Sequence, residues 1–435
     1  MAIEQLDMEG LWQHWEEELA LTGLHRHASR IRQQLSSINH TEYRIELEWF
    51  PEAGQGEDER NPPGAVMVEL DRRTRALRSF HIVRYGDANM MQGTACITQQ
   101  QAKALALQWV ERFAGLTEEA GNLELVHAND KEEAAVFSFR QTLDGIPFYP
   151  PMPIQVKVAW NGQVVAFSNY FVHMSQDITI HNSPQSPPSA EQEREVALAA
   201  FELIYAPESR ELPAWFYGVG ETFLNTATGE TMPYELHAPF LGQPPLDRRL
   251  LWEHKPGARE TNLEPFQPPS SIGERVMQHV SSSERYDGVI DWNAVHPDAV
   301  PIRSEELERI YEAVCEWGSR MYPEESGQWK ITRVLRKSGI IMAILERYDA
   351  GYTAAFRVKV MVDSESFNVI SDMRIGHLPK EAPDVMDKEQ AFQRIAASVI
   401  SKPYLVWHSQ KRSYQFMHMI DCPSMVDARS GEVAR

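Results

Sequence analysis

Cysteine is scarce in this sequence, and the few cysteines lie far apart. The three are Cys96, Cys315 and Cys422 among 435 residues, and none belongs to a C-x-x-C pair. Zinc ribbons and redox pairs need that spacing, so neither is indicated. The odd number of cysteines also argues against a disulfide framework.

Long apolar runs and a basic N-terminal start are missing as well. No run of about 18 apolar residues occurs, so no membrane-spanning helix is predicted. Residues 1–24 carry several carboxylates where an export signal needs a basic start and a continuous apolar run. We therefore expect a cytoplasmic protein with no membrane span.

Positive charge is in deficit. Lysine and arginine number 42 against 62 aspartates and glutamates, which gives a net charge of −20. Such a surface repels phosphate backbones and anionic membranes, so we expect no nucleic-acid partner. The charge favours solubility and the approach of cationic segments.

Catalytic and metal-binding motifs are also missing. The chain has no G-x-S-x-G elbow, no Walker-type phosphate loop and no H-E-x-x-H pair. Cys315 lies in a predicted helix beside Val314, which is a core-like setting. The closest histidine sets are His25 with His27, His377 near Asp372, and His418 near Asp421, and each is incomplete as a metal site. We therefore predict no catalytic residue, no metal site and no cofactor.

A six-residue segment occurs twice in the chain. It reads Asn225-Thr226-Ala227-Thr228-Gly229-Glu230 and, 202 residues later (427 − 225), Asp427-Ala428-Arg429-Ser430-Gly431-Glu432. Asn or Asp first and Gly fifth suit a side chain that binds its own turn and a residue with positive φ. Calcium takes about six to eight oxygen ligands and each segment offers only about two or three, so we interpret both as structural turns.

The order of predicted elements repeats together with this turn. A helix is predicted after the N-cap Thr98 and a second one after Ser304, 206 residues later (304 − 98). The predicted strands are 123–127, 134–142, 154–160 and 163–172 in the first copy, and 329–336, 340–348, 355–362 and 367–375 in the second. The turns Asn161-Gly162 and Asp363-Ser364-Glu365-Ser366 join the last two strands of each copy.

The remaining segments are assigned by the same criteria. Helices are predicted at Met8 to Leu19, 25–36, 189–205, 272–280 and 387–400. Strands are predicted at 43–50, at 65–70 and 76–85 around the turn 71–75, at 214–217 and at 404–407. The strand 214–217 is expected to pair with the strand that leads into the first six-residue turn. Residues 54–63, 183–188 and 376–385 are predicted as loops or linkers.

The sequence therefore predicts an α+β protein of tandem units, each a helix packed on an antiparallel β-sheet, with internal duplication. The predicted divisions are an N-terminal unit (1–95), a repeated unit (96–182), a half-unit of helix and hairpin (189–236), a proline-rich connector (237–303), the repeat of the unit (304–375) and the repeat of the half-unit (387–435).

These segments resemble the PepSY-like repeats of the YcdB/YcdC family of Bacillus-type bacteria. The resemblance spans residues 97–236 and 303–435. It is carried by Phe137-Ser138-Phe139, Asp144-Gly145-Ile146-Pro147-Phe148, Val156-Lys157-Val158, Asn161-Gly162-Gln163-Val164-Val165 and the two six-residue turns. It implies non-enzymatic modules, which are proposed in general to restrain peptidases or to bind at the cell envelope. Family members are often exported, and the family supplies no catalytic residues.

Consecutive aromatics such as Trp215-Phe216-Tyr217 must point to both faces of a strand. Core packing accounts for most of them, and an exposed groove for a peptide is the alternative. The leading hypothesis is a non-enzymatic binding or regulatory protein that engages a peptide or protein through a sheet edge or an inter-repeat groove. The alternatives are a hydrolase with a site assembled between the repeats and a structural homo-oligomer.

Overall fold

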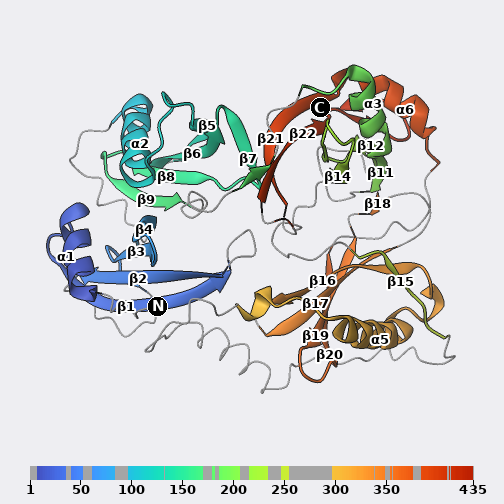
Figure 1. Cartoon of the computed structure of the whole chain (residues 1–435), viewed down its shortest axis with the longest axis horizontal. Helices are drawn as coiled ribbons and strands as arrows, with labels where there is room; N and C mark the ends of the chain where they lie inside the picture. Colours follow the sequence, from blue (N-terminus) through green and yellow to red (C-terminus); the bar gives the residue numbers. More distant parts are fainter. Residues whose placement is uncertain are drawn as a thin grey trace. The chain divides into compact units, whose positions relative to one another are not determined.

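The chain is an α+β protein of helices and mainly antiparallel sheets (Figure 1). It divides into two compact units, one formed by residues 1–36, 41–179 and 281–294 and the other by 37–40, 180–280 and 295–435. The computed structural model describes residues 7–35, 41–51, 61–83, 97–131, 133–169, 179–181, 186–205, 215–233, 246–253, 296–337, 339–347, 353–354, 356–375, 384–408, 411 and 413–434.

The first unit contains one sheet with the strand order β1-β2-β3-β4-β9-β8-β6, and both β5 and β7 pair with β6. Its helices are α1 (Met8–Glu18) and α2 (Gln99–Ala114). Its strands are β1 (Leu24–Leu35), β2 (Thr41–Pro51), β3 (Val66–Asp71), β4 (Leu77–Ile82), β5 (Leu123–Asp130), β6 (Ala134–Leu143), β7 (Ile146–Tyr149), β8 (Ile154–Ala159) and β9 (Val164–Asn169).

Apolar and charged residues alternate along the middle of β2, so that the apolar side chains there face the core of this unit. Ile45, Leu47 and Trp49 are fully buried and pack with the apolar faces of both helices. The charged residues between them face the other side of the sheet. Strand β4 lies in the predicted unit 1–95 and pairs with β9 of the predicted unit 96–182, so one sheet includes strands of both. The division at residue 95 stays a prediction.

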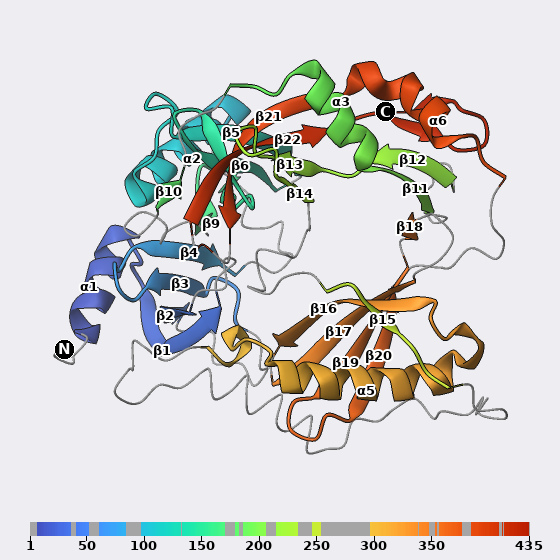
Figure 2. The same ribbon diagram turned by 45° about the vertical axis from the view of Figure 1, so that its right-hand side comes forward.

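One part of the second unit is a five-stranded sheet in the order β15-β16-β17-β19-β20, with the helix α5 across one face (Figure 2). Its elements are β15 (Arg248–Leu250), the 3-10 turn η4 (Pro297–Ala299), α5 (Ser304–Met321), η5 (Pro323–Glu325), β16 (Trp329–Lys337), β17 (Ile340–Arg347), β19 (Arg357–Asp363) and β20 (Val369–Ile375).

The other part of the second unit joins the two predicted half-units in one core. Strand β12 pairs with β11 and β23, and β13 pairs with β14 and β22. The elements are β10 (Ile180–His181), α3 (Ala190–Ala199), β11 (Phe201–Tyr205), β12 (Trp215–Val219), β13 (Thr222–Leu224), β14 (Thr231–Pro233), β18 (Thr353–Ala354), α6 (Lys388–Ile395), η6 (Ala396–Ser398), β21 (Ile400–His408), β22 (Ser413–Asp421), β23 (Met425–Asp427) and β24 (Val433–Ala434).

Several local predictions were wrong. Residues 25–36 were predicted as a helix, but Leu24–Leu35 form β1. Their Arg, Gln and Leu content favours a helix, and the long antiparallel pairing with β2 overrides that preference. The helix predicted over 189–205 ends at Ala199, because alternation of buried Phe201 and Leu203 with exposed Glu202 starts a strand. Among the described residues, the strand predicted over 214–217 does not pair with β13. It lies in β12, which pairs with β23, whereas β13 pairs with β22, and both partners come from the other half-unit.

Three further differences concern element ends and the connector. The N-cap of α5 is Arg303, one residue before the predicted Ser304. The helix predicted over 387–400 ends at Ile395, where a 3-10 turn leads into β21. The connector was predicted to be irregular, yet it contributes β15 to a sheet. The predicted helix 272–280 and the strand residue Tyr348 lie outside the described residues, as do residues 183–185 and 376–383 of the two linkers.

Candidate functional site

The six-residue turn occurs at four places in the described residues. In both predicted copies the first side chain accepts two backbone N–H bonds, at 3.1 and 3.3 Å for Asn225 and at 2.8 and 2.8 Å for Asp427. In the segments 71–76 and 363–368, Asp71 accepts from the backbone N–H and the hydroxyl of Thr74, and Asp363 accepts from the backbone N–H groups of Glu365 and Ser366. The sequence predicted turns at these two segments but did not show that they are the same kind of turn, because the fifth residue is Arg75 or Phe367 instead of glycine.

The predicted aromatic and thiol candidates are core residues. Trp215, Phe216 and Tyr217 are each at most 6% exposed, so β12 presents no aromatic platform. Burial raises the pKa of the Cys315 thiol, and a hydrogen bond with Tyr311 opposes that rise. A raised pKa disfavours the thiolate, which is the nucleophilic form. Burial also raises the pKa of Cys422. Cys96 lies outside the described residues.

The histidine candidates are spread over different elements. His27 on β1 stacks on Phe50 with ring centroids 3.7 Å apart. His418 on β22 is buried and packs edge-on against Phe416. His377 lies outside the described residues. Within the described parts of the chain, no three His, Cys, Asp or Glu side chains gather as a metal site.

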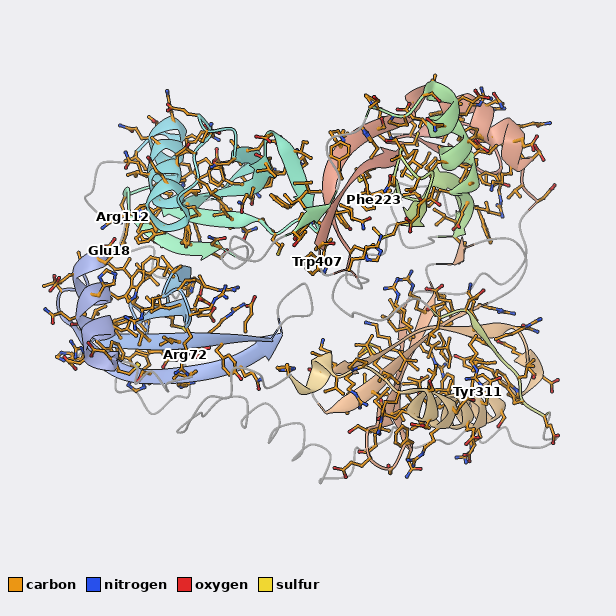
Figure 3. The ribbon with its side chains drawn as sticks, viewed as in Figure 1. Glu18, Arg72, Arg112, Phe223, Tyr311 and Trp407 are labelled. Atoms are coloured by element: carbon orange, nitrogen blue, oxygen red, sulfur yellow. The ribbon has the colours of Figure 1, made fainter. Side chains whose placement is uncertain are left out.

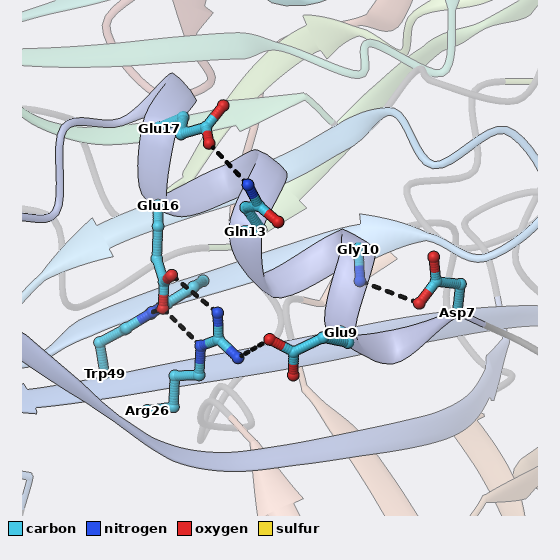
Figure 4. Close-up of polar contacts among 8 residues, drawn as sticks. All are labelled: Asp7, Glu9, Gly10, Gln13, Glu16, Glu17, Arg26 and Trp49. Carbon is cyan, nitrogen blue, oxygen red and sulfur yellow. Dashed lines mark hydrogen bonds and ion pairs between the residues drawn. The ribbon is translucent and has the colours of Figure 1, made fainter.

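Polar contacts hold α1 on the sheet of the first unit (Figure 4). The Arg26 guanidinium donates to both oxygens of Glu16, at 2.6 and 2.9 Å, and to Glu9 at 2.6 Å. Trp49 Nε1 donates to the same Glu16 carboxylate at 3.0 Å. The hydrogen bond from Arg26 is the main cause that lowers the pKa of Glu16, against the effect of burial. Figure 3 shows a second link, in which Arg112 of α2 meets Glu18 of α1 at 2.8 Å.

The face of β2 opposite the core carries a network of charged side chains. Glu42 is 8% exposed and pairs with buried Arg78 at 2.9 Å, while Glu46 is also 8% exposed and pairs with Arg32 at 2.9 Å. Burial raises the pKa of Glu46 to about 7, with the Arg32 charge acting against it. A carboxyl that titrates near neutrality makes this network sensitive to pH.

A sheet edge is the feature that bears most directly on binding. Strand β15 forms the edge of its sheet and lies antiparallel to β16, with Arg248 opposite Ile331 and Leu250 opposite Trp329. The amide of Leu246 donates to the Thr332 carbonyl at 2.8 Å. The equivalent addition of a strand from another chain is a common mode of peptide recognition. The sheet around α5 therefore holds an extended segment on its edge.

Side chains fasten this added strand to α5. Both terminal nitrogens of Arg248 donate to Glu308 at 2.7 Å, and its guanidinium lies 3.8 Å from the ring centroid of Tyr311. Tyr311 donates to the Arg249 carbonyl at 3.0 Å; Figure 3 shows this tyrosine on the helix. Sequence reasoning missed β15 because prolines surround it. The available signal was the placement of Leu246, Leu250 and Trp252 at even spacings on one side.

The family comparison concerns the first unit, which is an α+β domain with both helices on one sheet. Residues 26–170 match a family described as the YcdB, YcdC repeated domain. Over these residues the chain is similar to that repeated domain, so the resemblance inferred from its motifs is confirmed there. The match begins within β1 and ends just after β9, so it includes strands that precede the expected region 97–236.

A solved structure, the YpeB C-terminal domain of Bacillus megaterium, is also similar. It is 15% identical, and the similarity covers 53% of this chain and 99% of that chain with a TM-score of 0.30. No curated protein matches the chain. None of the described helices has the length and apolarity that crossing a membrane requires.

Proposed function

We propose that this protein is a non-enzymatic binding or regulatory protein that engages an extended segment of a peptide or protein partner through a sheet edge. The observation that supports this is β15, which comes from outside both predicted repeats and adds to β16 through main-chain pairing. Pairing with β15 uses the outer N–H and C=O groups of β16, which is the way that strand addition binds an extended peptide.

The proposal extends to the architecture, in which residues 96–182 and 304–375 are copies of one PepSY-like unit. Three observations support the duplication. A helix precedes four strands in each copy, with β5, β6, β8 and β9 paired in the same order as β16, β17, β19 and β20. The first strand pair of each copy has a register shift, between Leu125 and His127 and between Ile331 and Arg333. These two shifts lie 206 residues apart (331 − 125).

A displayed library of random extended peptides, selected on the full chain, tests the function. We expect enriched peptides that alternate apolar and charged residues. Hydrogen exchange should show protection on edge-strand amides when such a peptide is bound. The function is rejected if no peptide is enriched, or if every enriched peptide protects only helical or loop amides.

A further inference from the structure

Strand β5 of the first unit occupies the position that β16 occupies in the second. Both are the first strand after the long helix, and both pair with the following strand through the same register shift. The offset of 206 residues therefore places Glu124 where Lys330 lies and Val126 where Thr332 lies (330 − 124 and 332 − 126). The position that β15 occupies beside β16 therefore has a counterpart beside β5.

The outer edge of β5 is open along the part of the chain that the structure describes. Strand β16 has a neighbour on each side, whereas β5 pairs with β6 alone among the described residues. Residues 126–130 are all exposed, and Val126 is 56% exposed, which is high for an apolar side chain on a strand. The Thr332 carbonyl accepts the amide of Leu246, so the carbonyl of Val126 faces outward in the corresponding way.

The charge at this edge is inverted between the two units. In the second unit Lys330 lies opposite Glu346 and pairs with Asp247 beside the added strand at 3.2 Å. In the first unit the corresponding cross-strand pair is Glu124 with Arg140. Glu124 accepts both bonds of the Arg140 guanidinium, at 2.7 and 2.9 Å, and stays 47% exposed. A carboxylate has about four lone-pair positions, so it can accept a second cation.

The apolar requirement follows from the same register. Leu250 of the added strand lies opposite Trp329 and is fully buried in the core of its unit. The counterpart of Trp329 is Leu123, which is itself a core residue, and the next residue on that side is half-buried Leu125. A strand added to β5 therefore needs an apolar side chain beside Leu123.

We propose that the outer edge of β5 binds an extended peptide antiparallel to it, with an apolar residue beside Leu123 and a lysine or arginine that reaches Glu124 from the position of Asp247. The occupant is a basic and apolar segment of a partner protein. The net charge of −20 favours the approach of such a segment. This inference rests on the proposed function and assigns it to one edge and one class of peptide.

Two labelled peptides test the proposal against the full chain by fluorescence anisotropy. The first has the sequence of residues 246–253, and the second carries the change Asp247→Lys. We expect the second to bind about fivefold more tightly, as for a solvent-exposed ion pair. The protein variant Glu124→Lys should reverse that preference, while Glu119→Lys, a change at an exposed residue of the preceding turn, should leave it unchanged.

Main-chain pairing is tested separately. N-methylation of the peptide at positions 246, 248 and 250 blocks the amides that face the edge, and should abolish binding. Val126→Pro restricts the backbone beside the outward carbonyl on an edge strand, where proline is tolerated, and should weaken binding about tenfold. Val126→Thr leaves that backbone unrestricted and should bind like the unchanged protein.

Three results would overturn the proposal. The two peptides could bind equally well to the unchanged protein and to Glu124→Lys, or the N-methylated peptide could bind like its parent. Sedimentation could also show a dimer that Val126→Pro dissociates, which would make a second copy the occupant. If library peptides protect an edge other than β5, the proposed function stands and this inference fails. If none binds, both fail.

Discussion

The fifth residue of the six-residue turn has a left-handed backbone at all four positions, with φ of 60° at Arg75, 72° at Gly229, 63° at Phe367 and 74° at Gly431. For a residue with a Cβ atom this conformation costs about 1 kcal/mol or more. The side-chain and backbone bonds of the first and fourth residues hold the turn even where that cost is incurred. The hydrogen bonds therefore define the turn, and glycine only makes it easier to form.

The two glycines form a matched pair for measurement. A Cβ at Gly229 would meet nothing within 4 Å, whereas one at Gly431 would lie 2.6 Å from the Arg394 guanidinium, which donates to the Gly431 carbonyl. We expect Gly229→Ala to lower the free energy of unfolding by about 1 kcal/mol. Gly431→Ala should cost clearly more, because Arg394 must also move. Urea unfolding measures both, and equal losses would show that Arg394 adjusts without cost.

Glu46 is the other informative single residue. Its pKa is raised in the folded protein to about 7 from an ordinary value of 4.5. The folded state therefore binds this proton more tightly than the unfolded state, so the stabilising contribution is complete below pH 4.5 and is lost as the pH rises through 7. The charges that face it are Arg32, Glu69, Arg30 and Glu48.

We expect Glu46→Gln to stabilise the protein at pH 8 by up to about 2 kcal/mol and to change little at pH 5, because glutamine resembles the protonated carboxyl. Urea unfolding at both pH values checks this. Glu119→Gln, at an exposed position, is the control and should have no effect at either pH. An effect of Glu46→Gln that is the same at both pH values would contradict the assigned titration.

At the scale of elements, local sequence signals determine some helices and strands, and tertiary contacts determine others. The helix α2 has a complete capping box from Thr98 and Gln101 and ends at left-handed Gly115, all of which can be read from neighbouring residues. Strand β1 carries no such signal. This polar segment is stabilised as a strand because Arg26, Arg30 and Arg32 form ion pairs with carboxylates on α1 and β2.

Arg26→Ala should loosen α1 on the sheet without unfolding the rest of the unit. The guanidinium bonds to both Glu9 and Glu16 in Figure 4, so its loss leaves Glu16 with the Trp49 bond alone among the polar contacts drawn there. We expect faster amide exchange throughout Met8–Glu18 and unchanged exchange in β8 and β9. Glu9→Ala removes one outer bond and should have a smaller effect. Equal exchange in both variants would contradict this role for Arg26.

At the scale of the whole molecule, the two half-units share a core. Phe201 of one half-unit and Phe392 of the other are both fully buried, with ring centroids 5.3 Å apart. Strands from each half pair with strands from the other. Neither half has its own complete sheet, so we expect the two halves to unfold together.

Phe392→Ala should therefore lower the free energy of unfolding by about 3 to 5 kcal/mol and act on both halves. We expect faster amide exchange in α3 and β11 as well as in α6. The matched change is Phe356→Ala, which lies in the separate core under α5 and should speed exchange in the sheet that contains β15. Exchange that changes only within residues 387–435 would show that the halves are independent.

By itself the sequence determined the α+β class, the helix ends with caps, the turns and the family resemblance, because each depends on residues close together in the chain. It also led to the hypothesis of binding at a sheet edge, though not at a named strand. Only the tertiary structure decided which strands pair: β1 with β2, β12 with β23, and β15 with β16. Pairing depends on backbone groups that every residue has, so side-chain pattern alone cannot select the partner. The inverted charge at Glu124 and Lys330 became visible only once those pairings were known.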